Sequence, residues 1–440
     1  MLQNLMFFLL FGVEIFYKQN IYFKEQKMNI FKTGFTTLLL MGILASANFA
    51  SPILVESTNV NKNNTNSFME VDIKAFKNNI KVAKKIAGNA KVCAVLKANA
   101  YGAGISKVLP TIIEEKIPCV AITSNEEARV IRKMKYTGEI LRIRTATMGE
   151  IKDGLKYNIT EVLGNLDQAK KVDSLAKTIG KKLPIHIKLN SGGMDRNGID
   201  LSTDKGKESA VKLATLPHLK IKGLMTHFPY DDTSKVKANL KHFEEDTDFL
   251  ISKAKLDRNK LVLHAAASYA AVQVPQSRLD MIRPGKLIYG YGGGDENLPI
   301  QQIMSLKSQV AVINEYPKGS KVSYDGTYTL TRDSKLANIP VGYYDGYAKS
   351  LSNQGKVLIR GHKVPVVGRV TKNTFMVDVT DYPDIKAGDE VVLFGKQCGN
   401  EITQAEFEKG TGTILSETLG YWGSANPIFI KNYKMKEVCK

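Results

Sequence analysis

The chain has 440 residues, of which 43% are hydrophobic, so it can bury the cores of two domains, and its composition excludes wholesale disorder. Its formal net charge of +19 raises the question of nucleic acid. However, the basic residues are dispersed, no run of five occurs, and no zinc-finger or RNP pattern is present. We therefore expect a basic, solvated surface and no nucleic-acid partner.

The first fifty residues have the pattern of a targeting segment. From Met28 the chain has a basic start at Lys32, a short apolar run over 35–44 and the small-residue pattern Ala-Ser-Ala at 45–47. This layout is typical of a secretory signal peptide, and the apolar run is short for a membrane span. We expect residues 1–50 to be a signal peptide with a spurious extension before Met28, and the mature protein to be periplasmic. A membrane anchor is the alternative. Residues 51–67, rich in Asn, are expected to be a linker.

Strand-like and helical stretches alternate over residues 68–300. Eight apolar runs carry the strand pattern: VCAVLKA, CVAIT, EILRIRT, EVLG, IHIKLN, IKGLMTH, LVLHAAA and MIRPGKLIYG. This alternation predicts an α/β fold, a (β/α)8 TIM-like barrel, whose chemistry lies at the carboxyl ends of the strands. Polar residues fall at those ends: Lys97, Arg144, Lys188, His227, His264 and Arg283.

The pattern changes over residues 301–440. Short alternating runs separated by Gly and Pro predict a C-terminal all-β domain, and only ITQAEFEKG and ILSETLG have weak helical character.

None of the four cysteines has metal-site spacing, and we expect no metal. Cys93 and Cys119 lie in consecutive strand-like runs. Neighbouring strands of a parallel sheet are about 4.8 Å apart, which is within reach of a disulfide in an exported chain. Cys398 and Cys439 are expected to stay unpaired.

The segment AVLKANAYGAG, residues 94–104, ends an apolar strand with a lysine. Burying an ammonium is costly, so Lys97 is either a functional amine of lowered pKa that forms a Schiff base or a lysine that extends from the strand end to solvent. The segment resembles the cofactor-lysine signature of the alanine racemase family. The resemblance continues in order through residues 68–440.

That resemblance implies pyridoxal phosphate as cofactor and a two-base racemisation at Cα. Lys97 would hold the cofactor and act on one face, and Tyr324 in KVSYDGTY would act on the other, contributed by the partner of a homodimer. By the same match, the cofactor-binding residues are Lys97, Tyr101, His227, Ser268, Arg283, Gly285, Lys286 and Tyr421. The residues implied at the substrate are Arg196, Tyr343 and Lys372, with Arg144, Lys188, Asn190, Asn197, His264 and Asn373 in support.

Several departures resemble the periplasmic broad-spectrum racemases. They are the leader, Arg144, the NSGGMDRNG stretch, Thr371-Lys372-Asn373 and the cysteine pair Cys93 and Cys119, which that subgroup joins as a disulfide. These departures predict turnover of Lys, Arg and Met as well as Ala. Lys188 is more similar to the alanine enzymes, and the alternative is an alanine-specific racemase that supplies D-alanine for peptidoglycan.

Three functions from other classes of protein are alternatives to a racemase. A barrel-type pyridoxal phosphate decarboxylase would need an acidic residue at the pyridine nitrogen, where this chain has Arg283. A cofactor-homeostasis protein would lack the β domain with Tyr324. An inactive amino-acid-binding module would not need both Lys97 and Tyr324.

Overall fold

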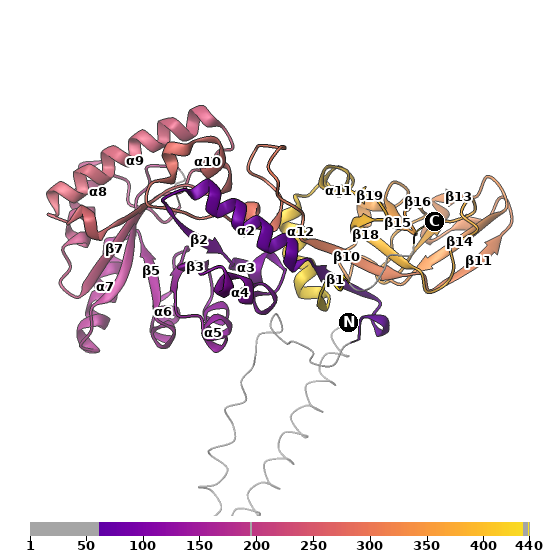
Figure 1. Ribbon diagram of the computed structural model, residues 1–440, viewed down its shortest axis with the longest axis horizontal. Coiled ribbons are helices and arrows are strands. Elements are labelled where there is room, and N and C mark those ends of the chain that lie inside the picture. Colours follow the sequence, from indigo (N-terminus) through magenta and orange to yellow (C-terminus); the bar gives the residue numbers. More distant parts are fainter. Residues whose placement is uncertain (1–60, 194–195, 434–438, 440) are drawn as a thin grey trace, which may run out of the picture. The chain divides into compact units, whose positions relative to one another are not determined.

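The computed structural model describes residues 61–193, 196–433 and 439, so the predicted signal peptide lies outside the described residues. Two sheets organise the described part (Figure 1). One is an eight-stranded parallel barrel, and the other is a ten-stranded, mostly antiparallel sheet. No helix in the described ranges is both long and apolar enough to cross a membrane.

The barrel strands follow one another around the sheet in the order β8-β7-β6-β5-β4-β3-β2-β9. Between β8 and β9 only single hydrogen bonds close the ring, such as Arg283 N to Ala266 O at 2.9 Å. The strands are β2 (Lys91–Val95), β3 (Cys119–Ile122), β4 (Glu139–Arg142), β5 (Ile159–Leu163), β6 (Leu183–Lys188), β7 (Leu219–Met225), β8 (Val262–His264) and β9 (Met281–Ile282). The predicted barrel is confirmed, because these are the eight runs identified in the sequence.

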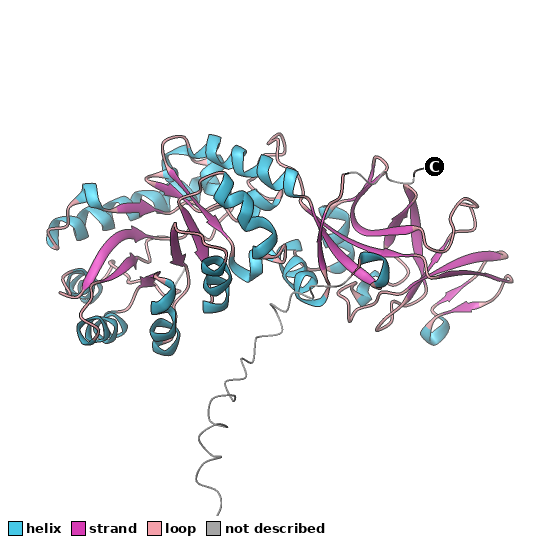
Figure 2. Cartoon of the chain, turned by 60° about the horizontal axis from the view of Figure 1, so that its bottom comes forward, coloured by secondary structure: helices cyan, strands magenta, loops and turns pink. Residues whose placement is uncertain are grey.

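Helices surround the barrel strands (Figure 2). They are α2 (Ile73–Ala87), α3 (Lys97–Tyr101), α4 (Ile105–Glu114), α5 (Asn125–Lys133), α6 (Met148–Gly154), α7 (Leu166–Thr178), α8 (Asp204–Ala214), α9 (Thr233–Lys253) and α10 (Ser268–Gln273). Several begin at a polar N-cap, and α5 begins at Ser124 with a capping box in which Glu127 takes part. Their apolar faces pack on the barrel and bury a continuous core.

The β domain is built on the larger sheet, in the order β11-β14-β17-β16-β15-β18-β10-β1-β20. Its strands are β1 (Ser67–Val71), β10 (Met304–Gln309), β11 (Val312–Tyr316), β14 (Ser334–Ile339), β15 (Lys356–Ile359), β16 (His362–Val367), β17 (Phe375–Asp378), β18 (Glu390–Gln397), β19 (Asn400–Ile402) and β20 (Ile428–Ile430). The pair β12 (Lys321–Val322) and β13 (Tyr328–Thr329) forms a separate ribbon, and the helices are α11 (Gln404–Thr411) and α12 (Leu415–Ala425).

Strand β1 belongs to the sheet of the β domain, although its position in the sequence suggested the barrel. Residues 68–71 were placed with the barrel, but β1 pairs with β10 and β20 of the β domain. The reason is that β2 already has a neighbour on each side, β3 and β9, so the barrel leaves no place for β1.

The two domains meet at the turn that follows β2. A Cβ on Gly102 would lie 2.0 Å from the carbonyl oxygen of Leu419 in α12, so only glycine allows this approach. Helix α12 is held in turn by Trp422, which is fully buried and packs within 5.4 Å of the Phe394 ring and 5.1 Å of the Phe407 ring, measured between centroids.

Two disulfides join the four cysteines. Cys93 and Cys119 face each other in register on β2 and β3, as adjacent strands predicted, and are bonded. The expectation that Cys398 and Cys439 stay unpaired is wrong, because these two are bonded as well. Cys398 lies in the turn between β18 and β19, and β20 runs parallel to β1 and returns the C-terminus to the same sheet.

Candidate active site

A cavity of about 720 Å³, the Lys97 cavity, opens at the carboxyl ends of the barrel strands. Its lining includes residues that follow seven of the eight strands, all except β5. Eleven of the predicted site residues line it: Lys97, Tyr101, Arg144, Lys188, Arg196, Asn197, His227, Ser268, Arg283, Gly285 and Lys286. The barrel therefore brings together, in one cavity, side chains that are up to about 190 residues apart in the sequence.

Lys97 follows the end of β2 and begins the short segment α3, whose residues form a left-handed turn rather than a right-handed helix. Ala98, Asn99 and Ala100 have φ of 54°, 52° and 58°, and Tyr101 follows at 54°. This conformation costs an L-residue about 1–2 kcal/mol, so the surrounding structure must hold the turn in place. The turn directs both Lys97 and Tyr101 to the cavity.

The electrostatic surroundings of Lys97 favour its neutral amine. Burial lowers the pKa of Lys97, the Arg196 guanidinium lowers it further, and the Glu127 carboxylate raises it. A lowered pKa leaves more of the amine free to act as a nucleophile or base near neutral pH.

Lys188 is a second amine in the cavity. It donates to Asn197 Oδ1 at 2.6 Å, and burial, together with Arg196 and Arg283, lowers its pKa to about 8. Lys188 therefore has a hydrogen-bond partner in Asn197, and its lowered pKa favours the neutral, reactive form of its amine.

Arg283 is a buried cation that lines the cavity and is held in place by hydrogen bonds to protein groups. Its Nη2 donates to the carbonyl oxygens of Thr226 and Ala265, each at 2.9 Å, and its Nη1 lies 2.7 Å from His264 Nδ1. A guanidinium has no acceptor, so His264 Nδ1 accepts and its proton lies on Nε2, which then donates to His186 Nδ1 at 2.6 Å. Both imidazoles are therefore neutral, in agreement with the pKa of about 3 that burial gives to His186.

His227 also lines the cavity. Burial, followed by the Arg283 charge, lowers the pKa of His227 to about 3. A neutral imidazole with a flat face is thereby presented to whatever occupies the cavity, and it adds no charge near Arg283.

Other lining residues of the cavity offer donors that suit an anion. The Ser268 hydroxyl oxygen accepts from Gly285 N at 3.2 Å and from Leu287 N at 3.1 Å, which leaves its own O–H to donate. The Tyr101 hydroxyl lies beside Gly285, where a Cβ would come within 2.5 Å of it, so glycine keeps this space open. Tyr101 is held by stacking on Tyr289, at 4.6 Å between ring centroids.

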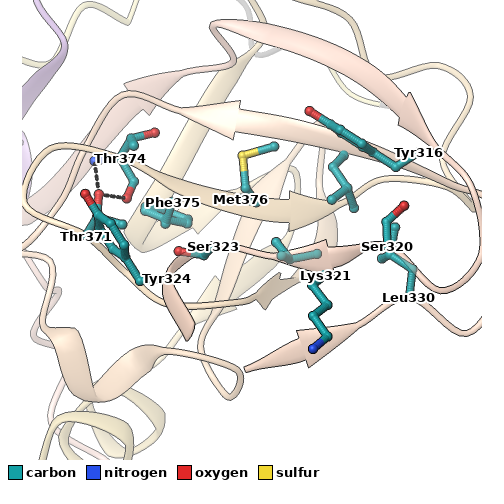
Figure 3. Close-up of a pocket in the computed structure, with 12 residues that line it drawn as sticks. Tyr316, Ser320, Lys321, Ser323, Tyr324, Leu330, Thr371, Thr374, Phe375 and Met376 are labelled. Atoms are coloured by element: carbon teal, nitrogen blue, oxygen red, sulfur yellow. Dashed lines mark hydrogen bonds between the residues drawn. The ribbon is translucent and has the colours of Figure 1, made fainter. Parts of the chain in front are cut away.

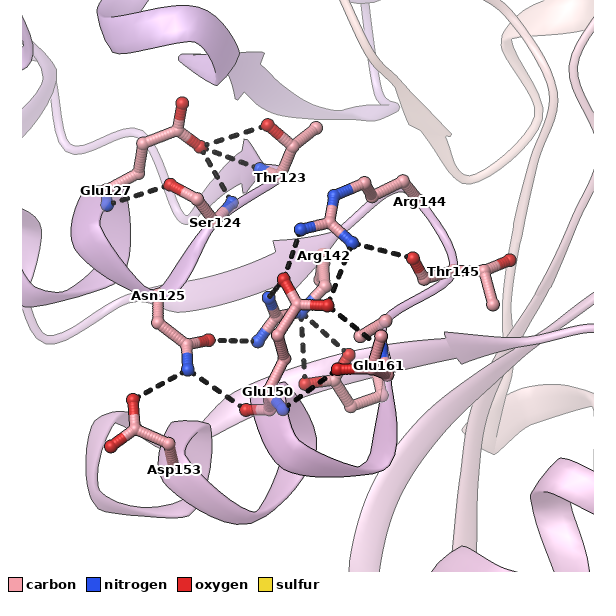
Figure 4. A network of polar contacts seen from close by, with 12 residues as sticks. Thr123, Ser124, Asn125, Glu127, Arg142, Arg144, Thr145, Glu150, Asp153 and Glu161 are labelled. Carbon is pink, nitrogen blue, oxygen red and sulfur yellow. Dashed lines mark hydrogen bonds and ion pairs between the residues drawn. The ribbon is translucent and has the colours of Figure 1, made fainter. Parts of the chain in front are cut away.

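Arg144 is held by an ion-pair network at the ends of β4 and β5 (Figure 4). Glu150 pairs with Arg144, and that hydrogen bond holds the pKa of Glu150 at about 2. Glu150 Oε1 also lies 3.8 Å from Nη1 of the fully buried Arg142, which binds Glu161 through Nε at 2.9 Å.

The predicted second base lies elsewhere. Tyr324 begins a one-turn 3-10 helix (Tyr324–Gly326) in the β domain and is 71% exposed. It lines a separate cavity of about 440 Å³ with Thr371, Phe375 and Met376 (Figure 3). The Lys97 cavity of the same chain therefore does not include Tyr324.

Other predicted residues of the β domain gather near that second cavity. Tyr343 N donates to Thr371 O at 3.0 Å, so the loop of Tyr343 lies against the turn that carries Lys372 and Asn373, both exposed. None of the three lines the Lys97 cavity.

Tyr421 and Asn190 lie outside the lining of the Lys97 cavity. Tyr421 was expected near a phosphate, but its hydroxyl donates to Tyr344 O at 2.9 Å and it does not line the Lys97 cavity, because α12 turns this ring toward the β domain. The side chain of Asn190 does not line the cavity either, although its backbone binds Ile199. His264 lies behind Arg283, outside the cavity lining.

Sequence reasoning missed three supporting residues. His186 lies two positions before Lys188 on β6, so strand alternation could have placed it on the same face. Tyr289 fixes Tyr101 and donates to Val95 O at 2.8 Å, and Glu127 was visible only as part of a Ser-x-x-Glu capping signature.

Comparisons with known proteins identify the class to which this fold and site belong. The sequence model of the alanine racemase N-terminal domain matches residues 71–292, and that of the alanine racemase C-terminal domain matches residues 303–429. The chain therefore belongs to the alanine racemase family, which makes it an isomerase.

Particular relatives narrow the comparison. A broad specificity amino-acid racemase of Pseudomonas putida is 49% identical over 83% of this chain and 89% of its own length. A lysine racemase of Proteus mirabilis is 42% identical over 82% of this chain and 88% of its own length. The crystal structure of alanine racemase from Bartonella henselae with covalently bound pyridoxal phosphate superposes with a TM-score of 0.74 at 24% identity, covering 83% of this chain and 99% of that one.

Proposed function

We propose that this protein is a pyridoxal phosphate-dependent racemase of broad amino-acid specificity that acts in the periplasm. The observation that carries the proposal is the Lys97 cavity, whose lining holds an amine of lowered pKa together with the buried Arg283 and hydroxyl groups that suit an anion. When bound there, pyridoxal phosphate would draw electrons from Cα and weaken its C–H bond.

The chain offers a partner for each part of such a cofactor. The Tyr101 and Ser268 hydroxyls suit a phosphate, for which Gly285 leaves space, and the neutral His227 suits the face of a ring. Arg283 keeps N–H donors beyond its bonds to protein groups, so it suits a ring nitrogen that accepts a hydrogen bond and stays unprotonated.

The proton at Cα would be moved by two groups of this chain on opposite faces of the substrate. The Lys97 amine would take or return it on one face, and the Tyr324 hydroxyl on the other. Arg196, whose charge acts on Lys97 in this cavity, would stabilise the tyrosinate. Because Tyr324 is absent from the lining of the Lys97 cavity of its own chain, a second copy would supply it, which implies a homodimer.

Broad specificity and export rest on separate support. Similarity to the broad specificity and lysine racemases extends over more than four fifths of the chain. Two disulfides suit an oxidising compartment, as the predicted signal peptide requires.

The test is to incubate the purified protein separately with L-alanine, L-lysine and L-arginine and to follow both enantiomers by chiral chromatography. We expect racemisation of all three, and none by Lys97→Ala. Turnover of alanine alone would favour an alanine-specific enzyme, the alternative that Lys188 supports. No turnover by the unaltered protein would overturn the proposal.

A further inference from the structure

Glu127 is a buried carboxylate for which neither the cavity nor the proposed chemistry has given a role. It is 5% exposed, although burying a charged carboxylate is costly unless hydrogen bonds compensate. Its two oxygens have different partners. Oε2 accepts from Ser124 N at 3.1 Å, which is the capping-box bond of α5, and also from Thr123 N at 2.7 Å and Thr123 Oγ1 at 3.3 Å.

The other carboxylate oxygen of Glu127, Oε1, takes no part in the helix cap. Figure 4 shows it directed away from Thr123 and Ser124. It accepts from Asn99 N at 3.1 Å, and Asn99 is the middle of the left-handed turn between Lys97 and Tyr101. One carboxylate therefore joins the start of α5 to the turn that follows β2.

A second capping box, at the start of α11, shows that a capping glutamate need not be buried as Glu127 is. Glu406 caps α11 from Thr403 in the same way and binds Lys363 at 2.9 Å, but its side chain is 40% exposed. The burial of Glu127 thus accompanies its contact with the turn rather than its contact with the helix.

The turn needs such support. The residues Ala98 to Tyr101 all have positive φ, and the right-handed alternative would point Lys97 and Tyr101 in other directions. Asn99 Oδ1 accepts from Ile105 N at 2.9 Å, which fixes the far end of the turn, while Asn99 N–H has the charged partner. Hydrogen bonds to an ionised acceptor are stronger than neutral ones.

We propose that Glu127 is a positioning residue, whose carboxylate holds the left-handed turn and so places the Lys97 amine and the Tyr101 hydroxyl on the cavity. This deepens the proposed function and rests on it for the cofactor. Separately from this positioning, the Glu127 charge raises the pKa of Lys97 and so offsets part of the lowering by burial and by Arg196.

The test compares Glu127→Gln with a matched control, Glu406→Gln. A glutamine keeps the volume and can still cap its helix through its oxygen, but its NH2 then faces Asn99 N–H, donor against donor. We expect Glu127→Gln to bind pyridoxal phosphate about 10- to 100-fold more weakly in absorbance titrations, the range for losing one hydrogen bond to a charged group. Glu406→Gln should bind it as the unaltered protein does.

A second readout does not depend on the cofactor. In the apo-protein, hydrogen–deuterium exchange of the peptide over residues 97–104 should accelerate in Glu127→Gln and stay unchanged in Glu406→Gln. Ala98 is exposed, and glycine adopts its φ of 54° without strain, so Ala98→Gly in the Glu127→Gln background should restore part of the affinity. If Glu127→Gln alone does not fold, both measurements are made on this double variant against Ala98→Gly.

The inference is overturned if Glu127→Gln loses thermal stability as Glu406→Gln does but keeps cofactor affinity and slow exchange in the turn. Failure of the unaltered protein to bind pyridoxal phosphate would instead refute the proposed function. The exchange experiment would still decide whether Glu127 holds the turn.

Discussion

Arg142 and Glu161 form a buried ion pair that supports the rim of the barrel, and removing one partner should destabilise the protein. The Arg142 side chain is 0% exposed, that of Glu161 is 8% exposed, and Nε lies 2.9 Å from Oε2. Arg142→Met keeps most of the volume but leaves Glu161 without its cation. Breaking a buried pair in this way costs about 3–5 kcal/mol.

The pH dependence of this loss has a definite sign. Burial raises the pKa of Glu161, while Arg142 lowers it, so the pKa should rise further in the variant. A carboxyl whose folded-state pKa lies above its unfolded-state value loses stability as pH rises through the folded-state pKa. The penalty of Arg142→Met should therefore be larger at pH 8 than at pH 5.

The assay is urea unfolding of both proteins at the two pH values. Adding Glu161→Gln to the variant should recover part of the loss at pH 8, because it removes the unpaired charge. A penalty that is equal at both pH values, or a variant as stable as the original, would refute this account of the pair.

Three further predictions follow from the site and the disulfides. Mixing Lys97→Ala with Tyr324→Phe, each inactive alone, should restore about a quarter of the activity if two copies share each site and subunits exchange at random; no recovery would contradict a shared site. Replacing both Cys93 and Cys119 by Ala opens a loop of 26 residues and should cost about 3–4 kcal/mol in urea unfolding, whereas an unchanged midpoint would exclude a stabilising role. Gly285→Ala places a Cβ 2.5 Å from a tyrosine hydroxyl and should weaken pyridoxal phosphate binding at least about tenfold in a titration, with thermal stability largely kept; tight binding would show that this space is not used.

The barrel could be predicted because its signals are local. Each strand is a short apolar run bounded by turn residues, and the polar residue that follows it lies at the carboxyl end, so Lys97 and Arg283 were placed correctly at one edge. The pairing of β1 with β10 and β20 has no such signal, because the partners lie more than 230 residues away.

The missed features depend on contacts between distant segments. The Cys398–Cys439 bond requires β20 to return the C-terminus to the sheet, which no spacing of cysteines reveals. Glu127 was recognisable as a capping residue from Ser124 three positions earlier, but its bond to Asn99 depends on how β2 and β3 are joined. The contact of the Tyr421 hydroxyl with Tyr344 O could not be predicted either, because the orientation of α12 depends on the packing of the buried Trp422.

The central claim is that Lys97 holds pyridoxal phosphate. The most direct measurement is to reduce the purified holo-protein with borohydride, digest it and locate the cofactor adduct by mass spectrometry. We predict one adduct, on Lys97 in the peptide that contains AVLKANAYGAG. An adduct on Lys188, the other cavity amine of lowered pKa, or no adduct at all would contradict the account.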